Sequence, residues 1–431
     1  MSASRTLCFV ALSAIATLAL GAGCSQPAFQ GQEETARREP AKVEITLGRQ
    51  WCIDMPSRCW NPVVLAGPRG ELWAFCHVRR DEKTSSGAVT FARFDGKNWT
   101  PWADAAPCSK VEPMGIAAAL DGSGNPVVVW EDLGSKKPEA RGLFFTRWTG
   151  REWTNAELLV TLGIFSNAQP TACTDSRGNV HLVYQDRLKP QESYSIGFHG
   201  ESPDKNWHMI FDGRTWTRPA PTTGPAKYCS ACPRLTAEPD GKVYLAAMIA
   251  PFTSLSRGNH YGGCQALDGK AWSALERLTP ENLSAGGVAS MAVDARGTKF
   301  VSWWNYPANN VQVARKEGGT LGPPEVVAPQ GSMPVLRSDT GGHVLLAWHD
   351  NGSVHVVARA GDGWTPEVTF PAPHPFTDLD WARGGPGTMF LRWGTREALY
   401  IQEVLLKQDG MPRPSLHPEA RDGPLPGHVS G

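Results

Sequence analysis

Short stretches in which apolar and polar residues alternate recur along the chain, and each follows a turn that contains glycine. Residues 180–186 (VHLVYQD) follow the turn at Asp175 and Gly178, and residues 127–132 (VVVWED) follow the turn at Asp121 and Gly124. A period of two is typical of strands whose side chains alternate between two faces of a sheet. Asp favours the start of a tight turn, and Gly supplies a positive φ. The pattern predicts strand–turn–strand hairpins and contains no helical period.

The turn belongs to a repeat in which Asp-x-x-Gly is followed by an aromatic residue six positions after the glycine. Full copies are Asp121/Gly124/Trp130, Asp175/Gly178/Tyr184, Asp294/Gly297/Trp303 and Asp339/Gly342/Trp348, and weaker copies centre on Gly70, Gly241 and Gly387. Successive glycines are 54, 54, 63, 56, 45 and 45 residues apart. A period of this size indicates an array of similar supersecondary units.

A second hairpin follows within most units, around Gly-x-x-Trp. It occurs at Gly96/Trp99, Gly150/Trp153, Gly213/Trp216, Gly269/Trp272 and Gly361/Trp364. Four strands per unit with this period predict an all-β fold, a β-propeller of four-stranded blades. We expect seven blades, or six if one weak copy is an insertion. The last unit has only one strand after Trp393, at 398–406, so the segment 42–48 is expected to pair with it and close the ring.

The two ends of the chain differ in composition from this region. Residues 1–24 combine Arg5 with an apolar run that is too short for a permanent membrane span. The run ends in Leu20-Gly-Ala-Gly-Cys24, which resembles the lipobox of bacterial lipoproteins; that resemblance implies lipidation of Cys24, and the alternative is an ordinary cleaved signal. We expect a flexible tether at 25–41, the propeller at 42–406 and a disordered tail at 407–431. The protein is then exported and either lipid-anchored at the bacterial envelope, on its periplasmic or outer-membrane face, or secreted.

Charge and cysteine content indicate which partners and which disulfides to expect. The chain has 42 basic and 42 acidic residues and no basic block, so nucleic acid is not expected as a partner. We expect a monomer without cofactor or metal that contacts the membrane only through its lipid. Eight of the ten cysteines lie outside the targeting segment, and an even number in an exported chain favours disulfides. The candidates are Cys52, Cys59, Cys76, Cys108, Cys229 and Cys232; the expected pair is Cys76 with Cys108, and Cys229 and Cys232 pair with each other or elsewhere.

The two ends of the predicted blades are not equivalent. The turns at one end are short and uniform, whereas the loops at the other end vary in length, and variable loops on a rigid scaffold concentrate function. Polar and aromatic residues that follow the inner strands or lie in these loops are therefore the candidate ligand-binding residues: His77, Asp132, Asp186, Tyr261, Trp304 and Asp350. For each of them the alternative is a solvated loop end that hydrogen-bonds nearby backbone.

Three segments resemble motifs of sialidase-like propellers. The hairpins DGKNW (95–99), FDGRTW (211–216) and LDGKAW (267–272) are similar to degenerate Asp-boxes. The segment Arg58-Cys-Trp-Asn-Pro62 followed by Ala74-Phe75-Cys-His-Val-Arg79 resembles the first blade of sialidases, with two extra residues in its first half. The resemblance implies three arginines on a substrate carboxylate, a proton-transferring acid and a tyrosine nucleophile. The residues that match these roles are Arg79 (or Arg58), Arg187 and Arg396, then Asp81, then Tyr306 (or Tyr261).

Two functions remain open from the sequence. The first is an envelope-anchored or secreted propeller that binds a glycan or protein ligand through its long-loop face. The second is a sialidase-like glycoside hydrolase acting on carboxylated sugars. Binding is preferred because the arginine motif of the first blade is interrupted and no glutamate is identifiable beside a nucleophilic tyrosine.

Overall fold

The protein was analysed as a computed structural model, in which the described residues all belong to the unit Pro40–Gly431. The described ranges are 43–56, 59–68, 70–81, 83, 86–109, 111–132, 141–162, 168–187, 204–222, 228–251, 261–269, 271–279, 290–305, 307–350, 352–372, 378–395 and 397–408. Within these ranges the regular structure consists of strands and short turns, with no helix.

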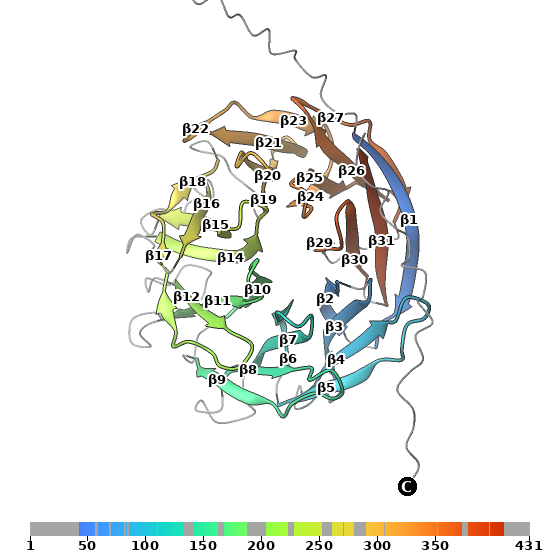
Figure 1. Ribbon diagram of the computed structural model, residues 1–431, viewed down its shortest axis with the longest axis vertical. Coiled ribbons are helices and arrows are strands. Elements are labelled where there is room, and N and C mark those ends of the chain that lie inside the picture. Colours follow the sequence, from blue (N-terminus) through green and yellow to red (C-terminus); the bar gives the residue numbers. More distant parts are fainter. Residues whose placement is uncertain are drawn as a thin grey trace, which may run out of the picture. The chain divides into compact units, whose positions relative to one another are not determined.

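The strands form seven antiparallel sheets that follow one another around a ring (Figure 1). Blade 1 contains β2 (Cys59–Ala66), β3 (Leu72–Arg79), β4 (Gly87–Phe94) and β5 (Ala103–Cys108). Blade 2 contains β6 (Val111–Leu120), β7 (Pro126–Asp132), β8 (Gly142–Arg147) and β9 (Glu157–Thr161). Blade 3 contains β10 (Thr171–Thr174), β11 (Val180–Arg187), β12 (Asp204–Phe211) and β13 (Ala220–Pro221).

Blades 4 to 6 each carry an additional short strand on the third strand of the blade. Blade 4 contains β14 (Tyr228–Ala237), β15 (Val243–Pro251), β16 (Tyr261–Asp268), β17 (Ala271–Trp272) and β18 (Glu276–Arg277). Blade 5 contains β19 (Ser290–Val293), β20 (Lys299–Asn305), β21 (Asn310–Glu317), β22 (Thr320–Leu321) and β23 (Glu325–Ala328). Blade 6 contains β24 (Ser332–Ser338), β25 (Val344–His349), β26 (Ser353–Ala360), β27 (Gly363–Trp364) and β28 (Val368–Pro371).

Blade 7 is built from both ends of the described chain, in the order β29 (Leu379–Arg383), β30 (Thr388–Gly394), β31 (Ala398–Gln408) and β1 (Val43–Asp54). Strand β1 runs antiparallel to β31, from Val43 opposite Gln408 to Asp54 opposite Ala398. The expected closure by an N-terminal strand and the seven-blade ring are therefore confirmed. Both closing strands are longer than expected, since β1 continues to Asp54 and β31 to Gln408.

The glycine repeat has the conformation that the sequence predicts. All seven central glycines have positive φ values, which are 82° at Gly70, 77° at Gly124, 84° at Gly178, 80° at Gly241, 82° at Gly297, 83° at Gly342 and 70° at Gly387. The aspartate at the start of the turn accepts backbone hydrogen bonds; Oδ1 of Asp175, for example, binds the amides of Arg177 (2.9 Å) and Asn179 (2.8 Å). These turns join the first and second strands of every blade, and we call this end of the ring the turn end and the opposite end the loop end.

The aromatic residue of the repeat packs between neighbouring blades. Trp130, Trp303, Trp348 and Trp393 are among the largest fully buried side chains. The apolar clusters combine residues of adjacent blades, for example blades 2 and 3 around Tyr184 and blades 6 and 7 around Trp393. Most of the tryptophans of the repeat therefore hold blades together.

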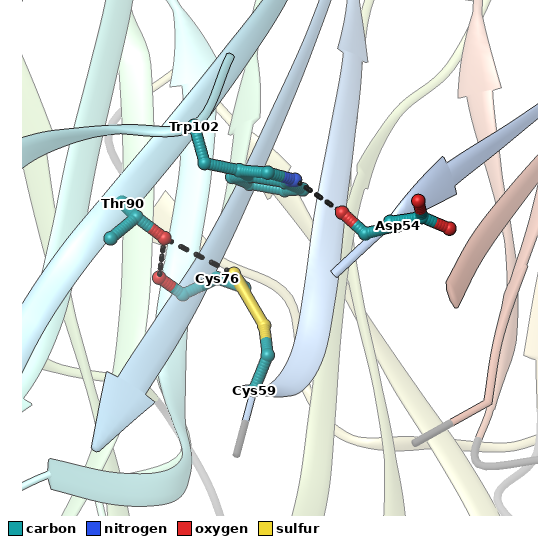
Figure 2. Close-up of a disulfide and its surroundings, with 5 residues drawn as sticks. All are labelled: Asp54, Cys59, Cys76, Thr90 and Trp102. Carbon is teal, nitrogen blue, oxygen red and sulfur yellow. Dashed lines mark hydrogen bonds between the residues drawn. A yellow bond between two sulfur atoms is a disulfide. The ribbon is translucent and has the colours of Figure 1, made fainter. Parts of the chain in front are cut away.

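The expected disulfide between Cys76 and Cys108 is wrong, because Cys76 pairs with Cys59, 6.1 Å away between Cα atoms (Figure 2). Strand order explains the difference. Cys59 and Cys76 lie on the adjacent strands β2 and β3, whereas Cys108 lies on β5, with β4 in between. Two inter-strand spacings amount to roughly 9–10 Å, beyond the reach of a disulfide. Cys52 on β1 is an exposed free cysteine, and the side chains of Cys229 and Cys232 lie outside the described part.

Candidate functional site

The predicted ligand-binding residues of the loop end mostly make local contacts. His77 on β3 is fully buried, and Asp132 on β7 accepts hydrogen bonds from the amide and hydroxyl of Ser109. The carboxylate of Asp350 accepts the amide of Ser353 and lies 3.0 Å from Nε2 of His355. Asp132 and Asp350 therefore help to hold loops in place, whereas His77 lies in the interior of blade 1.

The other three predicted binding residues lie in three different blades. Tyr261 begins β16, and the guanidinium carbon of Arg277 lies 4.5 Å from its ring centroid. Trp304 in β20 donates from Nε1 to Asn309, and Asp186 is the penultimate residue of β11, opposite Lys205. The six residues come one from each of blades 1 to 6.

The predicted catalytic residues are only partly described. Arg79 ends β3 and Asp81 follows two residues later, so these two lie together at the loop end of blade 1. Oδ1 of Asp81 accepts the amide of Lys83 at 2.8 Å and so caps a turn. Tyr306, Arg396 and the side chain of Arg187 lie outside the described part of the chain, as do Arg58 and Cys24. The roles assigned to these residues stay predictions.

A different group of arginines converges on the axis of the ring. Three guanidinium groups surround the carboxylate of Asp380, the second residue of β29. The distances are 3.7 Å from Nη1 of Arg234 on β14, 3.8 Å from Nη2 of Arg337 on β24 and 3.7 Å from Nη2 of Arg392 on β30. Blades 4 and 7 are not neighbours in the ring, so the contact between Arg234 and Asp380 crosses the axis. We call Arg234, Arg337, Arg392, Asp378 and Asp380 the axial arginine cluster.

Repeat register explains why these side chains meet. Arg234 and Asp380 both lie four residues before the first residue of their turns, Glu238 and Gly384, and so at the same height along the axis. Arg392 is directly opposite Asp380 in the β29–β30 ladder and also forms an ion pair with Asp378. Three blades thus contribute to one site at one level of the channel.

The carboxylate at the centre of the cluster is ionised at neutral pH. Burial by itself would raise the pKa of Asp380, but the field of Arg234, Arg337 and Arg392 outweighs burial and holds this pKa below its ordinary value. The pKa of Arg392 is raised, because Asp378 and Asp380 oppose the effect of its own burial. With three arginines and two aspartates, the cluster keeps one positive charge in excess.

Two of the three arginines have hydrogen-bonding capacity to spare. In the described part of the chain, Asp380 is the only polar partner recorded for Arg234 and for Arg337, and at 3.7 and 3.8 Å neither contact is a hydrogen bond. The side chains are 39% and 21% exposed, and that of Asp380 is 31% exposed. Because each guanidinium has five N–H donors, the cluster can bind an anion without breaking an existing hydrogen bond.

A second ion pair crosses the axis nearer the turn end. Nη2 of Arg383 in blade 7 lies 3.0 Å from Oε2 of Glu238 in blade 4. Arg383 also donates to the carbonyl oxygens of Ser338 (2.6 Å) and Ala237. The buried Glu238 carboxylate additionally accepts the hydroxyl groups of Thr236 and Ser338 and the amide of Val293. This bridge connects blades 4, 5, 6 and 7, and its donors and acceptors are largely occupied.

Sequence reasoning missed the axial cluster, although the repeat contains a signal for it. The positions equivalent to Arg234 and Asp380 in the other blades are uncharged: Val63, Ala117, Thr171, Ser290 and Val335. Charged residues in a column that is otherwise small or apolar are the asymmetric part of the ring. Comparison of the inner strands blade by blade would have found them.

In the described part of the chain, no group of three or more His, Cys, Asp or Glu side chains is arranged so that it could hold a metal ion. Among the described residues there is no helix with the length and apolar character needed to cross a membrane. The class of protein that fold and site define is therefore a seven-bladed propeller with a charged axial site.

Comparison with known proteins finds distant structural similarity between this chain and several solved structures. No protein-family model matches the chain, and no curated protein matches it. Among solved structures, a protein of unknown function from Dyadobacter fermentans is 12% identical, with a TM-score of 0.48, over 84% of this chain and 99% of the other. A Hadza microbial sialidase is 14% identical, with a TM-score of 0.49, over 78% and 74%. An ulvan lyase is 11% identical, with a TM-score of 0.47, over 81% and 95%. Likeness at this level carries no conclusion about the activity of this chain.

Proposed function

We propose that the protein is a binding propeller that holds a carboxylated glycan at the axial arginine cluster, entering from the loop end. The observation that carries the proposal is the convergence of Arg234, Arg337 and Arg392, from three blades, on one site with donors to spare. Guanidinium groups recognise carboxylates through paired N–H donors, with directional as well as electrostatic preference.

The charge balance favours an anionic ligand over a neutral one. The excess positive charge of the cluster is partly buried, since the side chains of Arg234 and Arg337 are 39% and 21% exposed, so it is screened less than a fully exposed charge would be. A carboxylate of the ligand can accept hydrogen bonds from Arg234 and Arg337, because their contacts with Asp380, at 3.7 and 3.8 Å, are too long to be hydrogen bonds. A neutral sugar would form hydrogen bonds there but would not neutralise the excess positive charge of the cluster.

Binding accounts for the cluster better than hydrolysis does. A glycosidase needs a carboxylic acid that is protonated near neutral pH, which requires a raised pKa. The pKa of Asp380 is lowered, so this residue cannot donate a proton in that range. The feature that favours a hydrolase is the proximity of Arg79 and Asp81 at the loop end of blade 1. These two residues are therefore the ones replaced in the test for hydrolysis.

The test is calorimetric titration of the purified protein with 3′-sialyllactose and tri-galacturonate, against lactose and galactotriose. We expect only the carboxylated sugars to bind, and Arg234→Gln to weaken binding by about tenfold, as loss of a charged hydrogen bond does. Arg296→Gln is the matched control, since Arg296 is an exposed turn residue of blade 5. Equal binding of neutral sugars would refute the proposal. Sialoside turnover that is abolished by Arg79→Ala or Asp81→Ala would establish the hydrolase instead.

The proposal includes location at the bacterial envelope through lipidation of Cys24, with the protein acting as a monomer and without nucleic acid. Cys24→Ser is expected to move the protein from the membrane fraction to the soluble fraction of cells. Unchanged fractionation would exclude the anchor.

A further inference from the structure

A chamber of about 730 Å³ lies on the axis at the turn end of the ring. Its walls come from the inner strands and turns of blades 1, 2, 3, 4 and 7, together with Arg337 and Thr340 of blade 6. On the side of blade 5 the space is taken by Glu238, whose Oε2 accepts the amide of Val293, the last residue of β19. Uniform turns therefore surround an asymmetric space, and its volume is within the usual range for small-molecule sites.

The chamber is distinct from the loop-end side of the axial cluster. Arg234, Arg392 and Asp380 do not line it, whereas Arg337 does. Arg337 lies two residues before the turn residue Asp339, and its guanidinium reaches from the chamber wall to Asp380. Arg337 thus belongs both to the chamber wall and to the axial arginine cluster.

Opposite walls of the chamber have different chemistry. Blades 1 to 3 contribute apolar and small residues, including Leu65, Ala118 and Ala172, and the turn carboxylates of Asp121 and Asp175 also line the chamber. The facing wall contains two arginines, Arg337 and Arg383. Arg383 donates to its own chain at Ser338, Ala237 and Glu238, so it is structural. The guanidinium of Arg337 has no hydrogen bond within the described part of the chain and is the donor that remains for a ligand.

The turn of blade 3 contributes an ion pair to the chamber. Arg177, in the turn of blade 3, lines the chamber and has a side chain that is 69% exposed, beside Asp175. Arg296 occupies the same turn position in blade 5, which does not line the chamber. The chamber therefore has apolar strand residues on one side, Arg337 and Arg383 on the other, and an ion pair between Arg177 and Asp175 in the turn of blade 3.

We propose that the turn-end chamber is a second binding site, for a small organic anion with an apolar body. The anionic head lies on Arg337, and the body packs against the inner strands of blades 1 to 3. The chemistry is a carboxylate joined to a short hydrocarbon portion, whether it occurs as a free acid or as part of a larger molecule. The site shares Arg337 with the axial arginine cluster, whereas Arg234 and Arg392 belong to that cluster alone.

The ligand class is tested by calorimetric titration with octanoate, octylammonium and acetate. Octylammonium has a similar body with the opposite charge, and acetate has the same head without the body. We expect saturable one-to-one binding of octanoate alone, weakened by about tenfold in Arg337→Gln and unchanged in Arg296→Gln. Equal binding of acetate and octanoate, or equal binding of octanoate and octylammonium, overturns the proposal.

A blocking variant tests the location without changing a charge. A side chain at Gly385 meets open space at the chamber wall, and Gly363, on β27 and outside the chamber, is equally open. Gly385→Trp is expected to abolish octanoate binding, and Gly363→Trp to leave it intact. Octanoate binding that survives Gly385→Trp would place the site elsewhere. Glycan binding should respond to Arg234→Gln and not to Gly385→Trp, so the two proposals fail independently.

Discussion

Glu238 of blade 4 and Arg383 of blade 7 meet across the axis of the propeller, with 3.0 Å between Oε2 and Nη2. The two residues are 145 positions apart in the chain, and their ion pair connects blades that are not neighbours in the ring. Burial lowers the pKa of Arg383, and Glu238 opposes that effect. The bridge therefore fixes the distance across the ring and separates the chamber from blade 5.

Replacement of one partner of this bridge is expected to destabilise the protein. Glu238→Leu leaves the Arg383 guanidinium inside the channel without its counter-charge, which typically costs about 3 kcal/mol. We expect a lower urea midpoint for Glu238→Leu and partial recovery in Glu238→Leu with Arg383→Met, because the double variant contains no unpaired charge. Arg315→Ala, which breaks the exposed pair with Asp362, is the control and should leave the midpoint unchanged. A double variant no more stable than Glu238→Leu would contradict this account.

Stability is expected to fall as the pH decreases below about 6.5, because of a buried histidine pair in blade 3. Nδ1 of His181 lies 3.0 Å from Nε2 of His208, and burial, with a smaller effect of His181, lowers the pKa of His208 to about 3. The pKa of His181 is also lowered, chiefly by burial. The unfolded chain binds these protons near pH 6.5 and the folded state does not, so the free energy of unfolding decreases from pH 6.5 toward pH 3.

Urea midpoints between pH 4.5 and 7.5 measure this slope. His343 has the opposite effect on the pH dependence of stability. Its pKa is raised, mainly by the hydrogen bond to Asp339, so the stability that it contributes is complete below about pH 6.5 and is lost as the pH rises through the raised pKa. The difference between wild type and His208→Gln isolates the histidine pair. We expect the variant to lose less stability on acidification than wild type, and an equal slope in both proteins would disprove the assignment.

Two adjacent tryptophans allow a matched test of the repeat. Trp303 on β20 is fully buried between blades, whereas Trp304, the next residue, is partly exposed. Trp303→Ala should cost about 3–5 kcal/mol of stability, as large-to-small core substitutions do. Trp304→Ala should cost much less, since its side chain is not part of the core. Similar losses for both variants, measured by urea unfolding, would mean that the repeat position has no special packing role.

The repeat predicted the fold because its residues act locally. A glycine with positive φ, such as Gly178, and a carboxylate that caps its turn, such as Asp175, need no distant partner to be recognised. The disulfide and the site could not be predicted in this way, because they depend on which strands are adjacent and which blades face one another. Cys59 lies beside Cys76 through strand pairing, and Arg234 meets Asp380 only after the ring has closed.

The disulfide between Cys59 and Cys76 is expected to stabilise the first blade. The two cysteines are 17 residues apart, and closing a loop of this size in the unfolded chain contributes about 3 kcal/mol in the chain-entropy view. Its surroundings support the folded geometry: Oγ1 of Thr90 lies 3.2 Å from Sγ of Cys76, and Nε1 of Trp102 donates to the carbonyl oxygen of Asp54 (Figure 2).

The double variant Cys59→Ser with Cys76→Ser should unfold at a lower urea concentration, while Cys52→Ser, at an exposed free cysteine, should not. Reducing agent should lower the midpoint of wild type and leave that of the double variant unchanged, and a midpoint insensitive to both changes would show that the bond contributes nothing to folding.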